Sequence, residues 1–382
     1  MTRGHKPGNG PKRNTSRRLR QLRTLGLLLA VGALAFFWQP LQQRLQGPAA
    51  LRTVAAPEQA LPLQALPADA AAVAVRKGLV YTLATDRLRA IRPDGSVQWE
   101  KTLPEPGVQL YPSFDGVLVR TGGGDLLRYN ALGKATGRVA VPGEFSGVQE
   151  SVSGLLFEDR QGGRYTWTDV SGKVLGTQEI TGSHILKAVM DPDSGDTVIA
   201  TLKSDGSVLE SALHRFDAAG RITGARTFRD AVLLHMAFMD SRLTVVLDNR
   251  ILSLDPQMRD YWLVRDPARY QGADFGPERF WVDRIQTGVQ EAQALQSYDR
   301  DGQVVVSIPT VGDITLMEAG PRNLVAAVSG QRLQVFTDRG VLSGEIQLPK
   351  VPLGIHWLDE KHLLIRYGDG FSIEATEARK IL

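Results

Sequence analysis

The sequence predicts an all-β protein: an eight-bladed β-propeller of four-stranded antiparallel blades, with a seven-bladed ring as the alternative. Two observations support this prediction. One short phrase recurs along the chain with a period of about 40 residues, which is typical of propeller blades. The two ends of the chain supply the parts of one further blade, so that the ring can close.

The recurring phrase is clearest in its first copy, Arg87–Gly95, where an alternating strand ends in a Pro-Asp-Gly turn and a second strand follows. Later copies end in the glycines Gly133, Gly172, Gly220, Gly302 and Gly340, and Asp255-Pro256 fills the one gap without a glycine. The steps from 95 to 133, from 133 to 172 and from 302 to 340 are 38 or 39 residues long. The longer steps leave room for loop insertions, and the count is seven complete repeats.

The eighth blade is predicted to be composite. Residues 61–67 read as an outer strand with no blade of its own, because they resemble Glu100–Pro104 and Glu345–Pro349. The C-terminal part supplies three strands with no fourth: Gly354–Trp357, His362–Tyr367 and Phe371–Glu374. Pairing the two parts closes the ring and removes sheet edges that would otherwise invite aggregation. A seven-bladed ring would follow if one of the longer, weaker units at about 180–260 were miscounted.

The basic character of the chain belongs to its N-terminus. The net charge is +4, but residues 1–23 contain eight Lys or Arg and no acidic residue. Without them, 37 of the 45 basic residues stand against 41 acidic residues. The remainder is therefore slightly acidic, and we do not expect it to bind nucleic acid.

The N-terminal segments predict a membrane anchor. Thr24–Trp38 is an uncharged apolar run, which Leu41 extends. We expect a basic, disordered cytoplasmic tail at 1–23, a transmembrane signal-anchor at 24–41, a stalk at 42–59, the propeller at 60–376 and a short tail at 377–382. The positive-inside rule keeps the basic tail in the cytoplasm and places the propeller in the periplasmic or extracellular space.

Three alternatives to the anchor remain. Ala33-Leu34-Ala35 has the form of a signal-peptidase site, so a cleaved signal peptide is one alternative. Ser16-Arg17-Arg18 would begin a twin-arginine signal, although Arg20 stands where that signal has an apolar residue. A buried core helix is the third alternative, and eight neighbouring cations disfavour it.

One repeat carries a family resemblance. Asp94-Gly95-Ser96-Val97-Gln98-Trp99 resembles the repeat of the PQQ-like (quinoprotein-like) propellers, and only the first repeat has the Trp. The resemblance covers residues 61–376 and implies eight blades. It also implies relatives of two kinds, the quinoprotein dehydrogenases and the propeller subunit of the outer-membrane barrel-assembly machinery.

The best candidate for a metal site is the loop Asp191-Pro192-Asp193-Ser194-Gly195-Asp196. The carboxylates of Asp191, Asp193 and Asp196 alternate around a Gly turn, an arrangement that can supply oxygen ligands to Ca²⁺. The alternative is a hairpin turn in which the Asp side chains cap their own backbone. His235, Met236 and Met239 include soft copper ligands, but they lie in an apolar strand, and we expect the two methionines in the core and His235 half-buried.

The candidates for partner binding are Tyr261, Trp262, Phe280 and Trp281. Exposed aromatic side chains are frequent anchors of protein interfaces. These four lie within 256–292, the least regular part of the repeat pattern. Because long irregular insertions often carry function, we expect a binding loop there.

The sequence predicts a non-enzymatic, membrane-anchored scaffold for protein interactions, with envelope or membrane proteins as partners and a role in envelope assembly. No acid–base constellation, G-x-S-x-G or H-E-x-x-H motif is present. The alternative is a quinoprotein-like dehydrogenase or another ligand-binding propeller. The resemblance implies a vicinal cysteine pair in such dehydrogenases, and this chain has no cysteine. We expect no cofactor other than the candidate Ca²⁺.

Overall fold

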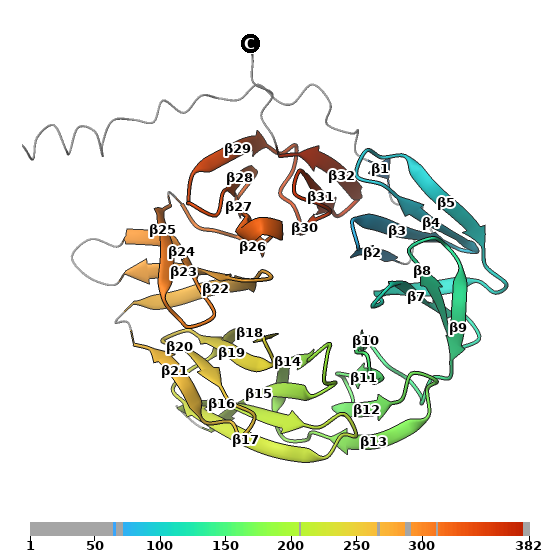
Figure 1. Ribbon diagram of the computed structural model, residues 1–382, viewed down its shortest axis with the longest axis horizontal. Coiled ribbons are helices and arrows are strands. Elements are labelled where there is room, and N and C mark those ends of the chain that lie inside the picture. The colour runs from blue at the N-terminus through green and yellow to red at the C-terminus, as the bar shows by residue number, and fades with distance from the viewer. Residues whose placement is uncertain are drawn as a thin grey trace, which may run out of the picture. The chain divides into compact units, whose positions relative to one another are not determined.

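The fold is an eight-bladed ring, as predicted, and the seven-bladed alternative is wrong. A computed structural model describes residues 64–65, 72–205, 208–265, 268–286, 292–310 and 312–376, which lie in one compact unit, Val54–Leu382. Its strands form eight four-stranded antiparallel sheets arranged around a common centre (Figure 1). The segment 24–41, predicted to span a membrane, lies outside the described residues. Within the described part of the chain, no helix has the length and apolar character needed to cross a bilayer.

Blades 1 to 7 each contain four consecutive strands, of which the first is the innermost and the last is the outermost. Blade 1 contains β2 (Ala72–Arg76), β3 (Leu79–Ala84), β4 (Arg87–Ile91) and β5 (Val97–Thr102), and blade 2 contains β6 (Gly107–Pro112), β7 (Gly116–Thr121), β8 (Leu126–Asn130) and β9 (Ala135–Val139). Blade 3 contains β10 (Gly147–Glu150), β11 (Leu155–Asp159), β12 (Arg164–Thr168) and β13 (Val174–Glu179). Blade 4 contains β14 (His184–Met190), β15 (Thr197–Asp205), β16 (Val208–Phe216) and β17 (Ile222–Arg229). Blade 5 contains β18 (Leu233–Met239), β19 (Arg242–Leu247), β20 (Ile251–Leu254) and β21 (Asp260–Val264). Blade 6 contains β22 (Arg269–Phe275), β23 (Phe280–Gln286), β24 (Ala292–Tyr298) and β25 (Val304–Pro309). Blade 7 contains β26 (Leu316–Ala319), β27 (Val325–Ser329), β28 (Arg332–Phe336) and β29 (Leu342–Gln347).

Blade 8 is composite, as the sequence predicted. Its three inner strands are β30 (Gly354–Trp357), β31 (His362–Tyr367) and β32 (Gly370–Ala375), and the N-terminal β1 (Gln64–Ala65) is the outer strand. In β1, Gln64 pairs with Phe371 and Ala65 with Gly370. The two ends of the propeller therefore meet within one sheet.

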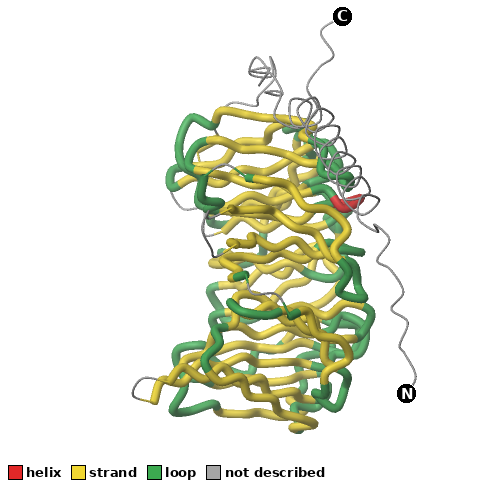
Figure 2. The backbone as a smooth tube through the Cα atoms, turned by 90° about the vertical axis from the view of Figure 1, so that its left-hand side faces the viewer, coloured by secondary structure: helices red, strands yellow, loops and turns green. Residues whose placement is uncertain are grey.

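The antiparallel order gives the ring two faces (Figure 2). The turn between the first and second strands of a blade, and the turn between its third and fourth strands, lie on one face, which we call the turn face. The remaining turns and the links between blades lie on the opposite face, because each strand reverses the direction of the one before.

The core consists of eight separate apolar clusters, one at each contact between neighbouring blades. Each cluster joins residues of two blades, as when Trp167 of blade 3 packs with Phe216 of blade 4. The closing contact has its own cluster, which includes Val80 of blade 1 and Phe371 of blade 8. Both faces of every sheet are thus covered by a neighbour, and only a closed ring achieves this for all eight.

The repeated phrase forms the turn between the third and fourth strands. In blade 2, the backbone N–H of Asn130 donates to Lys134 O, and the Asn130 side chain accepts from the N–H groups of Leu132 and Lys134. Gly133 has φ +77°, a left-handed conformation that favours glycine. Asp169, Asp217, Asp255, Asp299 and Thr337 accept the same two backbone bonds in blades 3 to 7.

These turns also join the blades. The Trp99 ring of blade 1 packs against Gly133 of blade 2, where an added Cβ would lie 2.8 Å from the ring, and the indole N–H donates to Ala131 O at 2.9 Å. Trp262 of blade 5 does the same in blade 6, packing on Gly302 and donating to Arg300 O at 2.9 Å. Trp262 follows Met258 by four residues, as Trp99 follows Gly95. The repeat position of Trp99 is therefore also a Trp in blade 5, and the prediction that only the first repeat has this Trp is wrong.

The expectation of an irregular insertion at 256–292 is wrong. The described residues of this range form β21, β22 and β23 of two ordinary blades, and 266–267 and 287–291 lie outside the described residues. The missing glycine had disguised the repeat, because Met258 takes the left-handed position at φ +62°. Its side chain lies against Gly224 of blade 4, where an added Cβ would be 2.8 Å from Met258 Cγ. In the other blades the turn residue at this position is a glycine and needs little room. In blade 5 it is Met258, and the room for its side chain comes from Gly224 in β17 of blade 4.

Candidate functional site

The candidate calcium loop forms a hydrogen-bonded hairpin turn between β14 and β15. The Asp191 carboxylate accepts from Asp193 N–H and from Ser194 Oγ, at 3.2 and 2.8 Å. Asp196 accepts from the buried Arg215 guanidinium at 2.7 Å. Among the described residues, no group of three or more His, Cys, Asp or Glu side chains is arranged to hold a metal ion. The Asp191 carboxylate therefore serves the turn and the Asp196 carboxylate an ion pair in this structure.

His235 lies on the inner strand of blade 5, between the inner strands of blades 4 and 6. Its Nε2 is 2.7 Å from Lys187 Nζ and 3.7 Å from Asp274 Oδ1. Burial, and then the nearby Lys187 charge, lowers the pKa of His235 to about 3. Burial raises the pKa of Asp274 to about 6. The neighbouring Met236 and Met239 are core residues, as the sequence analysis expected.

The four predicted aromatic anchors have different surroundings. Phe280 is fully buried at the contact of blade 6 with blade 5, and Trp281 is fully buried at the contact of blade 6 with blade 7, so neither side chain reaches the surface. Trp262 is committed to its contact with blade 6, and its ring stacks near Phe280. Tyr261 is exposed, with the Arg242 guanidinium 4.1 Å from its ring centre. Of these four, Tyr261 is exposed, Trp262 is partly buried, and Phe280 and Trp281 are buried.

The structure reveals another candidate, which we call the apolar patch. It consists of four side chains in turns of blades 2 and 3 on the turn face: Phe114, Leu132, Val152 and Val170, which are 46%, 77%, 56% and 49% exposed. Phe114 and Val152 lie in the turns between first and second strands, and Leu132 and Val170 in those between third and fourth strands. The available signal was a large apolar residue inside a polar turn, as in Ser113-Phe114-Asp115-Gly116.

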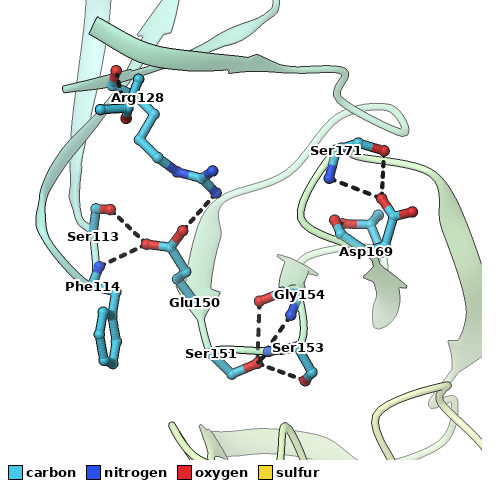
Figure 3. Close-up of polar contacts among 11 residues, drawn as sticks. Ser113, Phe114, Arg128, Glu150, Ser151, Ser153, Gly154, Asp169 and Ser171 are labelled. Carbon is cyan, nitrogen blue, oxygen red and sulfur yellow. Dashed lines mark hydrogen bonds and ion pairs between the residues drawn. The ribbon is translucent and has the colours of Figure 1, made fainter. Parts of the chain in front are cut away.

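Glu150 fixes the turn that carries Phe114. Its side chain is only 8% exposed, and it accepts hydrogen bonds from Ser113 Oγ at 2.5 Å and from Phe114 N–H at 2.7 Å. Arg128 completes the set with an ion pair at 2.6 Å. In Figure 3 these groups converge on Glu150 from blade 2. A buried carboxylate that is paired and hydrogen-bonded in this way is held in one geometry, so the Phe114 ring is presented from a fixed turn.

The other three side chains of the patch also stand on ordered turns. Ser151 Oγ accepts from the N–H groups of Ser153 and Gly154 and so closes the turn that carries Val152 (Figure 3). Asp169 accepts from the side chain and backbone of Ser171, and these bonds lower the pKa of Asp169. In blade 2, the backbone N–H of Ala131, which precedes Leu132, donates to Asp115 O at 2.8 Å. This last bond joins the two turns of blade 2, so that the Phe114 and Leu132 turns lie together.

Ion pairs link neighbouring blades elsewhere on the turn face. Arg300 of blade 6 contacts Asp240 of blade 5 at 2.5 Å, and Arg322 of blade 7 contacts Glu360 of blade 8 at 2.8 Å. Exposed pairs of this kind contribute little stability, about 0–1 kcal/mol each. An exposed pair of the same kind, Lys77 of blade 1 with Asp115 of blade 2, borders the apolar patch next to Phe114.

Comparison with known proteins supports the fold and shows no family. The sequence matches no family model and no curated protein. Sqt1 of Saccharomyces cerevisiae is similar in structure, with a TM-score of 0.55, 10% identity, and coverage of 82% of this chain and 97% of that chain. BamB of Moraxella catarrhalis has a TM-score of 0.48 and 12% identity, with 79% and 95% of the two chains covered. The WD40 domain of Neurospora crassa Pan2 has a TM-score of 0.44 and 9% identity, with 80% and 89% covered. At 10% identity, the similarity to Sqt1 shows the fold alone.

Proposed function

We propose that this chain is a non-enzymatic scaffold for protein interactions and that a partner docks on the apolar patch of blades 2 and 3. The observation that carries the proposal is the set of four exposed apolar side chains on hydrogen-bonded turns of one face. Contiguous exposed apolar side chains on a folded protein mark interaction sites, and the turns that carry Phe114 and Leu132 are joined by a backbone hydrogen bond. The turns are ordered before binding, so that less conformational entropy is lost when a partner docks.

Membrane attachment is part of the proposal. The uncharged run within residues 24–41 and the basic residues before it support an anchor with the propeller outside the cytoplasm. The D-x-x-G-x-x-x-W-like repeat supports a relation to the PQQ-like propellers, and through it an envelope-assembly role with other envelope or membrane proteins as partners. Protease added to intact spheroplasts tests the topology. A full-length, membrane-bound chain whose propeller is digested from outside supports it, and a propeller protected until lysis contradicts it.

The docking surface is tested with matched leucine variants. Leu132→Asp adds a charge to the apolar patch, and Leu353→Asp adds the same charge to an equally open position on the opposite face, where Leu353 is 69% exposed. Both variants are expected to fold, since each side chain projects into solvent. We expect Leu132→Asp and Phe114→Asp to lose the protein that crosslinks to the wild-type chain in cells, and Leu353→Asp to retain it.

Thermal unfolding of each purified variant controls for loss of structure. Equal crosslinking by Leu132→Asp and Leu353→Asp would show that the apolar patch is not the docking surface.

A further inference from the structure

The direction of β1 relates the start of the propeller to the turn face. β32 is the third strand of blade 8 and, like the other third strands, ends on the turn face, where Thr376 N–H donates to Lys361 O at 2.7 Å. β1 is antiparallel to β32, with Gln64 opposite Phe371. The N-terminal end of β1 is therefore directed towards the turn face, which also carries the apolar patch.

The proposed anchor is joined to the ring through this end of β1. Residues 42–63 separate the apolar run at 24–41 from β1, and a fully extended chain of this length spans at most about 75 Å. To turn the opposite face towards the membrane, the tether has to double back along blade 8, which takes up about 20 Å for a strand as long as β32. The attachment therefore favours orientations in which the turn face is directed towards the membrane.

Two lysines without a carboxylate partner stand in the turns of the apolar patch. Lys134 follows Leu132 by two residues and Lys173 follows Val170 by three, and both lysine side chains are exposed. Among the described residues, no carboxylate forms an ion pair with either ammonium group. The apolar patch is therefore flanked by two positive charges that a partner can neutralise.

The unpaired cations are specific to the blades that carry the patch. In blades 4 and 5 the cation at the same turn position pairs with the acidic residue that caps its own turn: Arg221 with Asp217 at 2.7 Å, and Arg259 with Asp255 at 2.8 Å. In blade 2 the capping residue is Asn130, which has no charge. In blade 3 the Asp169 carboxylate accepts from Ser171 Oγ at 2.6 Å (Figure 3). Neither cap neutralises the lysine of its turn.

The charges around the patch favour a protein segment over the bilayer surface. Anionic lipid is bound by clusters of about four to eight basic residues, whereas two lysines stand here beside the carboxylates of Asp115 and Asp169. A layer of phosphate groups brought onto these turns is repelled by both carboxylates. A protein segment can instead place single acidic side chains beside the lysines and apolar side chains over the patch.

We propose that the apolar patch binds a membrane-proximal segment of a second protein held in the same membrane, with apolar side chains against Phe114 and Leu132 and acidic side chains beside Lys134 and Lys173. This inference rests on the proposed docking function and names the class of its partner. Confinement of both proteins to one membrane raises their effective concentration. A small patch can therefore hold its partner without a large interface.

Label transfer from a single thiol identifies the partner. The chain has no cysteine, so Leu132→Cys can carry a cleavable, label-transferring photo-crosslinker in membranes from cells that express the tagged full chain. We expect the label on a peptide that contains Asp or Glu and adjoins a membrane span of another protein. The wild-type chain gives the background, and Leu353→Cys on the opposite face is expected not to label that peptide. Label on a soluble protein, on lipid alone, or at the wild-type level overturns the proposal.

Charge reversal tests the two lysines. In the Leu132→Cys background, Lys134→Glu together with Lys173→Glu is expected to lower label transfer to the partner about tenfold. Lys101→Glu together with Arg366→Glu makes the same change of charge at exposed positions near the opposite-face ends of β5 and β31, and is expected to leave the transfer unchanged. Thermal unfolding of each purified variant controls for loss of structure. Equal transfer by the two charge-reversed chains contradicts the proposal.

The outcomes separate this inference from the docking function on which it rests. If Leu132→Asp abolishes crosslinking in cells but the label from Leu132→Cys reaches a soluble protein, the docking surface stands and the membrane-proximal partner is wrong. If Leu132→Asp retains crosslinking as Leu353→Asp does, the docking function itself fails.

Discussion

The contact between Trp262 and Gly302 allows a direct test of how the turns join the blades. Gly302 has φ +77°, and an added Cβ would lie 2.8 Å from Trp262 Cε3. Gly330 is the matched control, because its φ is +60° and nothing lies within 4 Å of an added Cβ. Alanine at either position incurs the left-handed backbone cost of about 1–2 kcal/mol. Only Gly302→Ala also forces the Trp262 ring to move, which costs about 1–3 kcal/mol more.

We therefore expect Gly302→Ala to lower the free energy of unfolding by about 2–5 kcal/mol and Gly330→Ala by about 1–2 kcal/mol. Urea unfolding followed by tryptophan fluorescence gives both values from midpoints and slopes. In a Trp262→Ala background the ring is absent, so Gly302→Ala is expected to have only the backbone cost. Equal losses for the two glycine variants in the wild-type background would refute the reasoning, since the Trp262 contact would then contribute nothing.

Three further outcomes are expected. Glu150→Ala leaves Arg128 without its buried partner and is expected to cost about 3–5 kcal/mol in urea unfolding and to weaken crosslinking at the apolar patch; a loss of stability below about 1 kcal/mol would contradict the described role of Glu150. The pKa of His235 is about 3 in the folded chain against 6.5 ordinarily, so its contribution to stability falls as pH drops below about 6.5, by about 2 kcal/mol at pH 5; His235→Gln should lose correspondingly less stability than wild type between pH 7 and pH 5, and an equal loss would exclude His235 as the cause. Gly224→Ala crowds Met258 and is expected to cost about 1–3 kcal/mol, but little in a Met258→Gly background, where the crowding side chain is absent; an equal cost in both backgrounds would show that the two residues are not coupled.

The blade architecture was predictable because its signal is local. The turn between third and fourth strands requires a left-handed residue shortly after the third strand ends, and glycine meets that requirement within the repeat itself, as at Gly133 and Gly340. Closure was predictable for a related reason. The N-terminal strand and the C-terminal three-stranded set each lack a partner, and a ring satisfies both.

The contacts between blades could be decided only by the tertiary structure. Met258 breaks the glycine pattern, and Gly224, which makes room for it, lies 34 residues earlier in a different blade. Nothing local to the turn reveals that compensation, so 256–292 had the least regular pattern in the sequence although the unit at Asp255-Pro256 was counted as a repeat. Phe280 and Trp281 have the composition of binding anchors, but their burial depends on packing between β23 and the strands of neighbouring blades.

The candidate site depended on tertiary structure in the same way. Phe114 is one apolar residue in a polar turn, and its fixed exposure results from Glu150, which comes from the next blade. Asp196 of the 191–196 loop pairs with Arg215 from another strand of blade 4, a contact that the spacing of the three aspartates does not reveal. The sequence by itself determined the repeat, the turns and the closure of the ring, because backbone conformation and strand pattern act over a few residues. Which side chains face solvent was decided by contacts between segments far apart in the chain, because burial is a property of the assembled ring.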